Sequence, residues 1–439
     1  MTYFLNFAFG LFKSVGSISR SKRVAPLTSD LSSGFYVFLL AVPLSLGIAE
    51  ASGFPAIMGL VTATVGGLLV SWFMGAKFTI KGPAAGLIVI VLGSVNEMGG
   101  ENHMLGWQWT LGAIFISGIV QVIFGLLKWG DYVNKIPPSA IQGMLAAIGV
   151  VILSKQLYIL MGIPAFDERG HHLSKPIDLI QNLWYGLHHV SLWVSVIGFF
   201  SIMLVWVWSK VNHPLLKAIP SPLLVMAIGI PAAHYLQLED KYLLKFSDSS
   251  NFWPLPISFG GFAKPWVFIK YVFLFAIIGS LESLLTISAM DRITKGKDSD
   301  KNKDLWAVGI GNMVSSLFGG LPMISEVARS TANIHNGARS HRSNAFHGLF
   351  ILVFLLFSGF FNHVIPLTAL AAMLVMVGVK LASPKVLIEL KKIGTEQLWG
   401  FFVTLIASLA LDLLWGLALG SLAKILAEKV IHKSAAKGS

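Results

Sequence analysis

The stretch at residues 319–331, GGLPMISEVARST, places a charged and hydroxyl-bearing segment inside a strongly apolar half of the chain. Its Gly and Pro residues interrupt a helix, and a new helix can start after them. A helix that begins in an apolar setting exposes unpaired backbone N–H groups and the positive end of its dipole, and both attract anions. The stretch therefore predicts an anion-binding helix end.

The composition around this stretch is that of a membrane protein. Of 439 residues, 55% are hydrophobic and 12% are charged, which lies outside the range of soluble domains. A bilayer core about 30 Å thick needs roughly 20 apolar residues per helix, and a separate large soluble domain would not fit. About fourteen apolar segments begin near Ser32, Pro55, Pro83, Trp109, Ser139, Trp193, Pro222, Trp266, Asp304, Met323, Asn344, Pro366, Gln397 and Trp415.

A second interruption lies at the matching place in the first half, where residues 80–83, Ile-Lys-Gly-Pro, precede the third segment. Paired Gly/Pro-interrupted segments are typical of transporters built from inverted repeats. We therefore predict an all-α polytopic membrane protein of about 14 spans. It would consist of 7+7 inverted repeats over residues 30–240 and 262–432, with half-helices at spans 3 and 10.

The basic residues indicate orientation. The formal net charge is +12, and many Lys and Arg residues fall in alternate loops, as at residues 292–303 and 380–392. By the positive-inside rule, both termini are cytoplasmic, with residues 1–29 as an arm and 433–439 as a tail. Membrane orientation therefore accounts for the positive net charge, and nucleic-acid binding is not needed to explain it.

The chain has no Cys, so disulfides and thiolate metal sites are excluded. The sequence also contains no recognisable metal or cofactor motif.

Arg329 is the most informative residue of the second half, because an ionisable residue within the membrane is costly and marks a functional site by default. Its planar guanidinium suits oxyanions such as sulfate or bicarbonate. The alternative is a structural pair with Glu326, three residues earlier on the same helix face. The expected substrate-binding residues of this half are Ser325, Glu326, Ala328 and Arg329.

In the first half, the expected substrate-binding residues are Pro83, Ala84, Ala85 and Gly86. Proline suits the first helical turn, and small residues let a ligand approach the backbone closely. By itself a Gly-Pro pair is also compatible with a plain turn or kink. This end is expected to face the second one across the same cavity.

Glu282 is a lone carboxylate in the eighth segment, and ionising it in an apolar setting costs free energy. It is a natural carrier of H⁺ or Na⁺, and Thr286, one turn later, would supply a hydroxyl ligand. The alternative is a polar residue that joins helices. Residues 291–292 are expected to cap or anchor this segment. Other polar residues near apolar runs, expected to be interfacial or to pack, are Glu50, His347 and Asp412.

The ordered motifs of the second half resemble the signature region of the sulfate permease (SulP) inorganic anion transporters. These motifs are ESLLT at 282–286, DRIT at 291–294, NMVSSLFGG at 312–320, ARS at 328–330 and NGAR at 336–339. Pro43, Gly47 and the Gly-Pro pair at 82–83 are similar to first-half motifs of that family. The resemblance covers roughly residues 30–430.

This resemblance implies a fourteen-span fold with core and gate domains and substrate between spans 3 and 10. It places Glu282 on the family's coupling carboxylate and Arg329 beside the anion. Two departures stand out. Only about ten residues follow the last span, so no STAS domain is expected here and dimer contacts supplied by that domain are in question. Glu326 is an unusual carboxylate at the anion end, and we hypothesise that it is protonated during binding or neutralised by Arg329.

The function expected from these residues is secondary active transport of a small inorganic anion, sulfate or bicarbonate, coupled to H⁺ or Na⁺ through alternating access. The alternative is an anion channel or uncoupled exchanger on the same fold. A nucleobase symporter fits the Ala-Arg-Ser run less well, and a membrane enzyme lacks a catalytic motif. The expected location is the inner (plasma) membrane, with the lipid bilayer and a homodimer as candidate partners.

Overall fold

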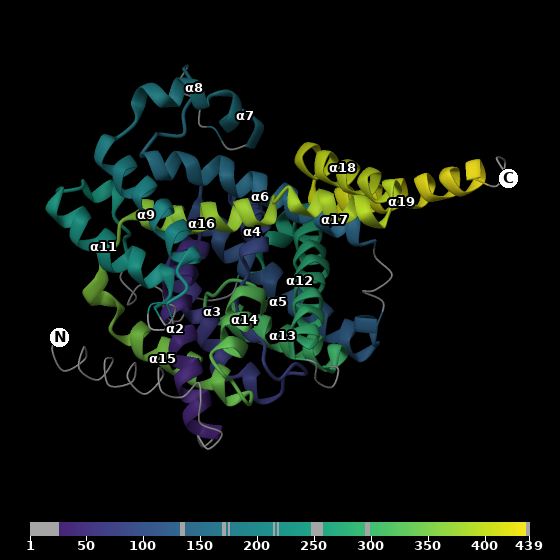
Figure 1. Cartoon of the computed structure of the whole chain (residues 1–439), viewed down its shortest axis with the longest axis horizontal. Helices are drawn as coiled ribbons and strands as arrows, with labels where there is room; N and C mark the ends of the chain where they lie inside the picture. Colours follow the sequence, from purple (N-terminus) through teal and green to yellow (C-terminus); the bar gives the residue numbers. More distant parts are fainter. Residues whose placement is uncertain are drawn as a thin grey trace. The chain divides into compact units, whose positions relative to one another are not determined.

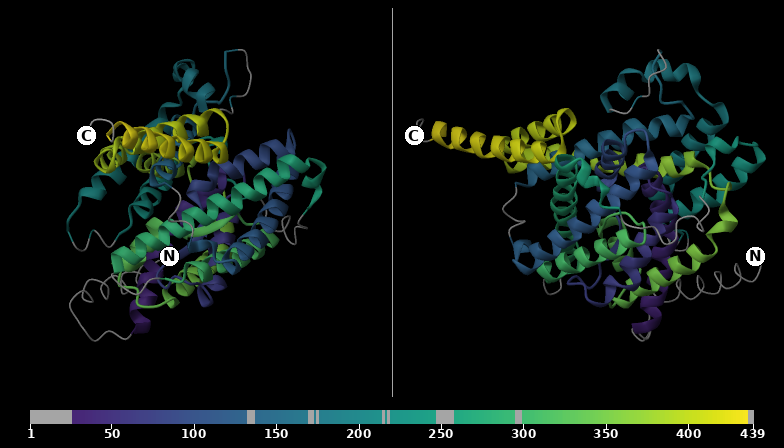
Figure 2. Two further views of the ribbon diagram at one scale, coloured as in Figure 1. Left: turned by 90° about the vertical axis from the view of Figure 1, so that its right-hand side faces the viewer. Right: turned by 180° about the vertical axis from the view of Figure 1, so that it is seen from behind.

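The computed structural model describes residues 26–131, 137–168, 173, 176–213, 216, 219–246, 258–294 and 299–435. Most of the expected N-terminal arm and the last four residues of the expected tail lie outside the described residues. The chain divides into two compact units, Met1–Gly130 with Val196–Met373, and Asp131–Ser195 with Leu374–Ser439. Figures 1 and 2 show the predominantly helical architecture.

The first unit holds both interrupted segments. Its elements are α2 (Pro26–Ala51), α3 (Ile57–Leu68), η1 (Val70–Trp72), β1 (Ile80–Pro83), η2 (Ala85–Leu87), α4 (Ile88–Gly99), α5 (His103–Leu126), most of α9 (Leu192–Lys210), α11 (Ser221–Tyr235), η5 (Asp240–Tyr242), η7 (Gly260–Ala263), α12 (Pro265–Thr294), α13 (Lys301–Leu317), β2 (Met323–Glu326), α14 (Val327–His335), α15 (Arg342–Leu356), η8 (Ser358–Phe361) and the first part of α16 (Leu367–Leu381).

The second unit is also helical. Its elements are α6 (Pro138–Met161), α7 (Pro176–Gln181), α8 (Leu183–Gly186), η4 (Leu187–His189), the start of α9, the end of α16, α17 (Lys385–Ile393), α18 (Thr395–Ala410) and α19 (Leu413–Ala435). Helices α18 and α19 lie side by side (Figures 1 and 2), and both contact α6. Each unit thus combines segments from both halves of the chain, and the inverted-repeat boundaries stay a prediction.

The predicted class, an α-helical polytopic membrane protein, is confirmed. Among the described residues, six helical stretches are long and apolar enough to cross a membrane, and four shorter apolar helices accompany them. The six are Leu27–Ala51, His103–Leu126, Pro138–Met161, Leu192–Lys210, Pro265–Thr294 and Leu367–Ile393. The detail of 14 spans in 7+7 repeats stays a prediction.

Both predicted interruptions take the form of a short strand followed by a helix. Strands β1 and β2 pair antiparallel, with Ile80 opposite Glu326 and Pro83 opposite Met323. Each strand leads into a helix, β1 into η2 and α4, and β2 into α14. The two helices therefore start at opposite ends of one ladder about 10 Å long, judged from four residues per strand. The positive ends of both helix dipoles lie next to this ladder.

Glycines bring the helices around the ladder into close contact. A Cβ atom at Gly348 of α15 would lie 2.7 Å from Cα of Gly67 on α3. Helices α5 and α13 meet in the same way, since a Cβ at Gly118 would lie 2.6 Å from the carbonyl oxygen of Gly309. Such contacts between small residues are a usual basis of helix packing in membranes.

We predict that Gly348→Val destabilises the protein, because the added atoms meet backbone, which cannot move aside as a side chain can. The expected loss in the free energy of unfolding is about 1–3 kcal/mol, measured by denaturant titration in detergent micelles. Gly359→Val is the matched control, since a Cβ there has no atom within 4 Å. Equal stability of the two variants would contradict the close backbone contact between α3 and α15 at Gly348.

Candidate anion site

Arg329 lies in the first turn of α14 with its side chain fully buried. Its guanidinium lies against β1, because a Cβ atom at Gly82 would overlap Nη1. Within the described part of the chain, Nε, Nη1 and Nη2 have no hydrogen-bond partner. A buried cation whose three nitrogens all lack an acceptor is costly unless a ligand supplies one there. The arrangement is suited to an anion at the ladder.

Glu326 is the N-cap of α14, and its Oε2 accepts a hydrogen bond of 2.8 Å from the backbone N–H of Arg329. The carboxylate of Glu326 thus binds the backbone N–H of Arg329, whereas the guanidinium of Arg329 has no hydrogen-bond partner among the described residues. The structural pair considered from the sequence therefore takes the form of a helix cap. Glu326 occupies one of the N–H groups at the start of α14 that could otherwise bind an anion.

Glu282 lies at the other helix start. Its side chain on α12 is buried, and a Cβ atom at Gly86 would overlap its Oε1. Oε1 has no hydrogen-bond partner in the described structure. Glu282 also interacts electrostatically with Glu326. The carboxyl group therefore lies at the N-terminal turn that leads into α4, within range of the charges on the ladder. Thr286 is buried one turn further along α12.

The remaining residues expected from the sequence also gather at the ladder. Pro83 ends β1, Ala84 is the extended N-cap of η2, and Ala85 follows it. Ala328 is half-buried in the first turn of α14. Ser325 is engaged in the protein itself: its N–H donates to Ser283 Oγ over 3.0 Å, and its hydroxyl donates to a buried carboxylate over 3.0 Å.

That carboxylate belongs to a buried ion pair that the sequence reasoning missed. Lys81 of β1 and Asp304 of α13 are both fully buried, and Nζ donates to Oδ1 and Oδ2 over 2.7 and 2.6 Å. Lys81 Nζ also donates to Thr79 Oγ1 and Ser325 Oγ. Asp304 Oδ1 accepts further bonds of 3.1 Å from the N–H groups of residues 75 and 76. The available signal was Lys81, which is followed by an uncharged run to residue 96, since Asp304 itself ends a charged stretch at residues 297–304.

The sequence indicates an interfacial or packing role for His347. It is fully buried in α15, both ring nitrogens lack a partner among the described residues, and it interacts electrostatically with Arg329. The other polar residues have local roles. Asp412 accepts from Trp415 N at the start of α19, and Asp291 accepts from Ser299. Glu50 is exposed at the end of α2.

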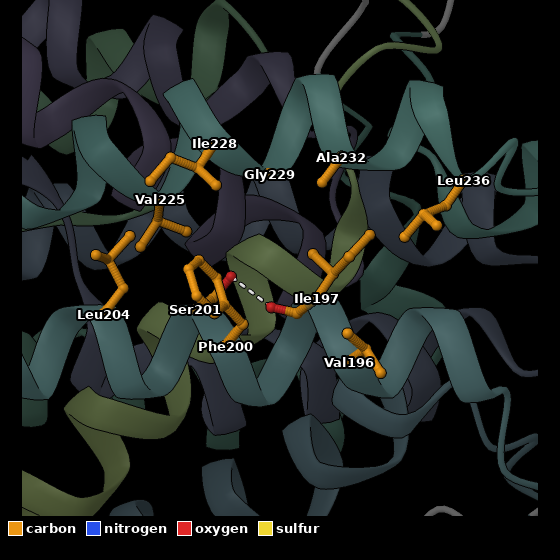
Figure 3. Close-up of a pocket in the computed structure, with 10 residues that line it drawn as sticks. All are labelled: Val196, Ile197, Phe200, Ser201, Leu204, Val225, Ile228, Gly229, Ala232 and Leu236. Atoms are coloured by element: carbon orange, nitrogen blue, oxygen red, sulfur yellow. Dashed lines mark hydrogen bonds between the residues drawn. The ribbon is translucent and has the colours of Figure 1, made fainter.

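An apolar groove in the first unit has a different character. It lies between α9 and α11, has a volume of about 150 Å³, and is lined by ten residues, none of them charged (Figure 3). The hydroxyl of its one serine, Ser201, donates to the carbonyl of Ile197 over 2.7 Å. The groove therefore offers no group that would bind an anion.

The fold and this site define a polytopic helical membrane protein with two helix starts at a charged ladder. Comparisons with known proteins specify the family: the model of the sulfate permease family matches residues 27–407. "Putative sulfate transporter YvdB" of Bacillus subtilis (strain 168) is 30% identical over 402 residues, which cover 90% of this chain and 72% of that protein. The chain therefore belongs to the sulfate permease family, and it is an anion transporter of the membrane, not an enzyme.

Two further comparisons agree with this assignment. The "Bicarbonate transporter BicA" of Picosynechococcus sp. is 24% identical over 403 residues, 90% of this chain and 69% of that one. The solved transmembrane domain of a cyanobacterial bicarbonate transporter BicA has a TM-score of 0.75 at 23% identity, covering 91% of this chain and 98% of that domain. The latter likeness shows the shared fold.

We predict that the Lys81–Asp304 pair is needed for stability as a pair. Lys81→Met or Asp304→Leu alone leaves one buried charge without its partner, which is expected to cost about 3–5 kcal/mol. The double variant Lys81→Met/Asp304→Leu removes both charges and is expected to recover much of that loss. Denaturant titration of the wild type, the two single variants and the double variant in detergent gives the coupling energy between Lys81 and Asp304. Single variants as stable as the wild type would contradict the prediction.

Proposed function

We propose that the protein is a secondary active transporter of a small inorganic oxyanion, sulfate or bicarbonate, which binds at the β1–β2 ladder and moves with H⁺ or Na⁺ by alternating access. The observation that carries this proposal is the fully buried guanidinium of Arg329, whose three nitrogens have no partner among the described residues. Its planar fork can hold two oxygens of one oxyanion.

The backbone around the ladder supports the same location. The first N–H groups of a helix have no partner within it, and both helices begin beside Arg329 or Glu282. Gly82 and Gly86 have no side chain, so the backbone is accessible where the side chains of Arg329 and Glu282 lie. A small anion can therefore approach N–H groups and the guanidinium together, as in other anion sites at helix starts.

The charges at the site favour coupled transport. Lys81 is balanced by Asp304. Of the other charges, Glu326 lies within electrostatic range of both Arg329 and Glu282. An incoming anion would meet a net negative site while both carboxylates are ionised. Loading Glu282 with H⁺ or Na⁺ removes one negative charge, so that the cation and the anion favour each other's binding.

Membrane placement belongs to the same proposal. Large apolar side chains are exposed on several of the long helices, among them Ile123, Phe199 and Phe273, and the bilayer would cover them. The alternating basic loops support a plasma-membrane protein with both termini in the cytoplasm. A homodimer stays an expectation.

The proposed function is tested by uptake of radiolabelled sulfate and bicarbonate into proteoliposomes under imposed pH and Na⁺ gradients. Arg329→Gln is expected to raise the apparent KM for the anion at least about tenfold, because it removes charge-assisted hydrogen bonds. Arg342→Gln, a change at an exposed arginine of α15, is the matched control. Unaltered anion uptake in the Arg329 variant, with wild-type uptake present, would refute this site.

Glu282→Gln tests the coupling separately. The amide imitates a permanently neutral carboxyl group, so anion uptake is expected to persist but to lose its dependence on the cation gradient. Glu101→Gln, at an exposed carboxylate, should keep that dependence. Wild-type uptake that ignores both gradients would instead support a channel or an uncoupled exchanger, and a Glu282→Gln variant that is still driven by the gradient would exclude Glu282 as the carrier.

A further inference from the structure

The imidazole of His347 is fully buried in α15, where that helix packs against α2 and α3. A Cβ atom at Gly34 of α2 would lie 3.0 Å from the backbone nitrogen of His347, so the two backbones nearly touch. Neither Nδ1 nor Nε2 has a hydrogen-bond partner in the described structure. Buried polar groups are nearly always hydrogen-bonded, and a neutral imidazole has one donor and one acceptor to satisfy.

One face of α3 connects this histidine with the anion site. Ala63 lies beside Gly82, because a Cβ atom added at Gly82 would lie 4.0 Å from the Cβ of Ala63 and would overlap Arg329 Nη1. Gly67, one turn further along α3, touches Gly348, the neighbour of His347. His347 and Arg329 also interact electrostatically. The Arg329 guanidinium and the backbone of α15 next to His347 therefore both lie beside residues 63–67 of α3.

Arg329 already has the carboxylate of Glu326 within electrostatic range, so Arg329 and His347 lack hydrogen-bond acceptors and not a counter-charge. Arg329 and His347 together present five ring or guanidinium nitrogens with no partner among the described residues. A purely structural histidine would donate to a carbonyl or a side chain of a neighbouring helix, and the structure gives it no such bond. One acceptor-rich ligand would satisfy both residues.

We propose that His347 binds the transported anion together with Arg329 and selects oxyanions over halides; this inference rests on the proposed function. The guanidinium fork holds two oxygens of a planar or tetrahedral oxyanion, and a further oxygen accepts a hydrogen bond from the imidazole N–H. A halide is a monatomic ion that can accept from both groups only where their N–H bonds converge on one point, whereas an oxyanion presents a separate oxygen to each group. A site built to hydrogen-bond a group discriminates strongly against ligands that lack it.

The test compares His347→Phe and His347→Gln with the wild type in proteoliposomes. The measured quantities are the apparent KM for radiolabelled sulfate and bicarbonate and the inhibition constant of chloride. In His347→Phe, the oxyanion KM is expected to rise about tenfold while chloride inhibition stays unchanged. His347→Gln keeps an N–H donor and should recover part of the difference. His335→Phe, at an exposed histidine of α14, is the matched control.

Each outcome decides between the alternatives. If Arg329→Gln raises the oxyanion KM and His347→Phe does not, the site stands and His347 has no part in it. If Arg329→Gln has no effect, the proposed function itself fails. Equal effects of His347→Phe on oxyanion and chloride would overturn the selectivity. Should His347→Phe not fold, His347→Leu decides, because it also lacks an N–H donor and a wild-type oxyanion KM in it would overturn the proposal.

Discussion

The antiparallel pairing of β1 with β2 is the constraint on which the rest of the site depends. A backbone segment that leaves a helix inside a membrane must find hydrogen bonds within the protein, and each of these two strands supplies them to the other. The ion pair of Lys81 and Asp304 ties the ladder to α13. Ser330 Oγ accepts from Ile80 N over 2.9 Å and Asn312 Oδ1 accepts from Met323 N over 2.6 Å, which anchors the beginning of each strand.

The two halves of the chain contribute different things to this arrangement. The second half supplies the charged side chains, Glu282 and Arg329, and the first half supplies bare backbone at Gly86 and Gly82, against which they lie. Any side chain at either glycine would meet a charged group. Segments far apart in the sequence thus supply the charged side chains and the space beside the backbone, and the anion would bind where these segments meet.

The ion pairing separates two kinds of buried charge. Lys81 and Asp304 form an ion pair in which Thr79 Oγ1 also accepts from Lys81 and the backbone N–H groups of residues 75 and 76 donate to Asp304. Such a satisfied network stabilises the structure. Arg329, Glu282 and His347 instead retain unpaired atoms among the described residues. Partly satisfied polar groups in a low-dielectric setting have a free energy that changes sharply when an ion binds, which is what a transport site requires.

The sequence by itself determined the membrane class and the two interruptions, and it indicated Arg329 and Glu282 as candidate site residues, because apolar composition, Gly-Pro breaks and isolated charges are local properties of the chain. The tertiary structure alone decided which strand pairs with which, that Ser325 bonds to Asp304, and that Glu326 caps α14 through the backbone. It also placed His347 near Arg329. These features depend on contacts between distant segments, whose partners no local pattern specifies.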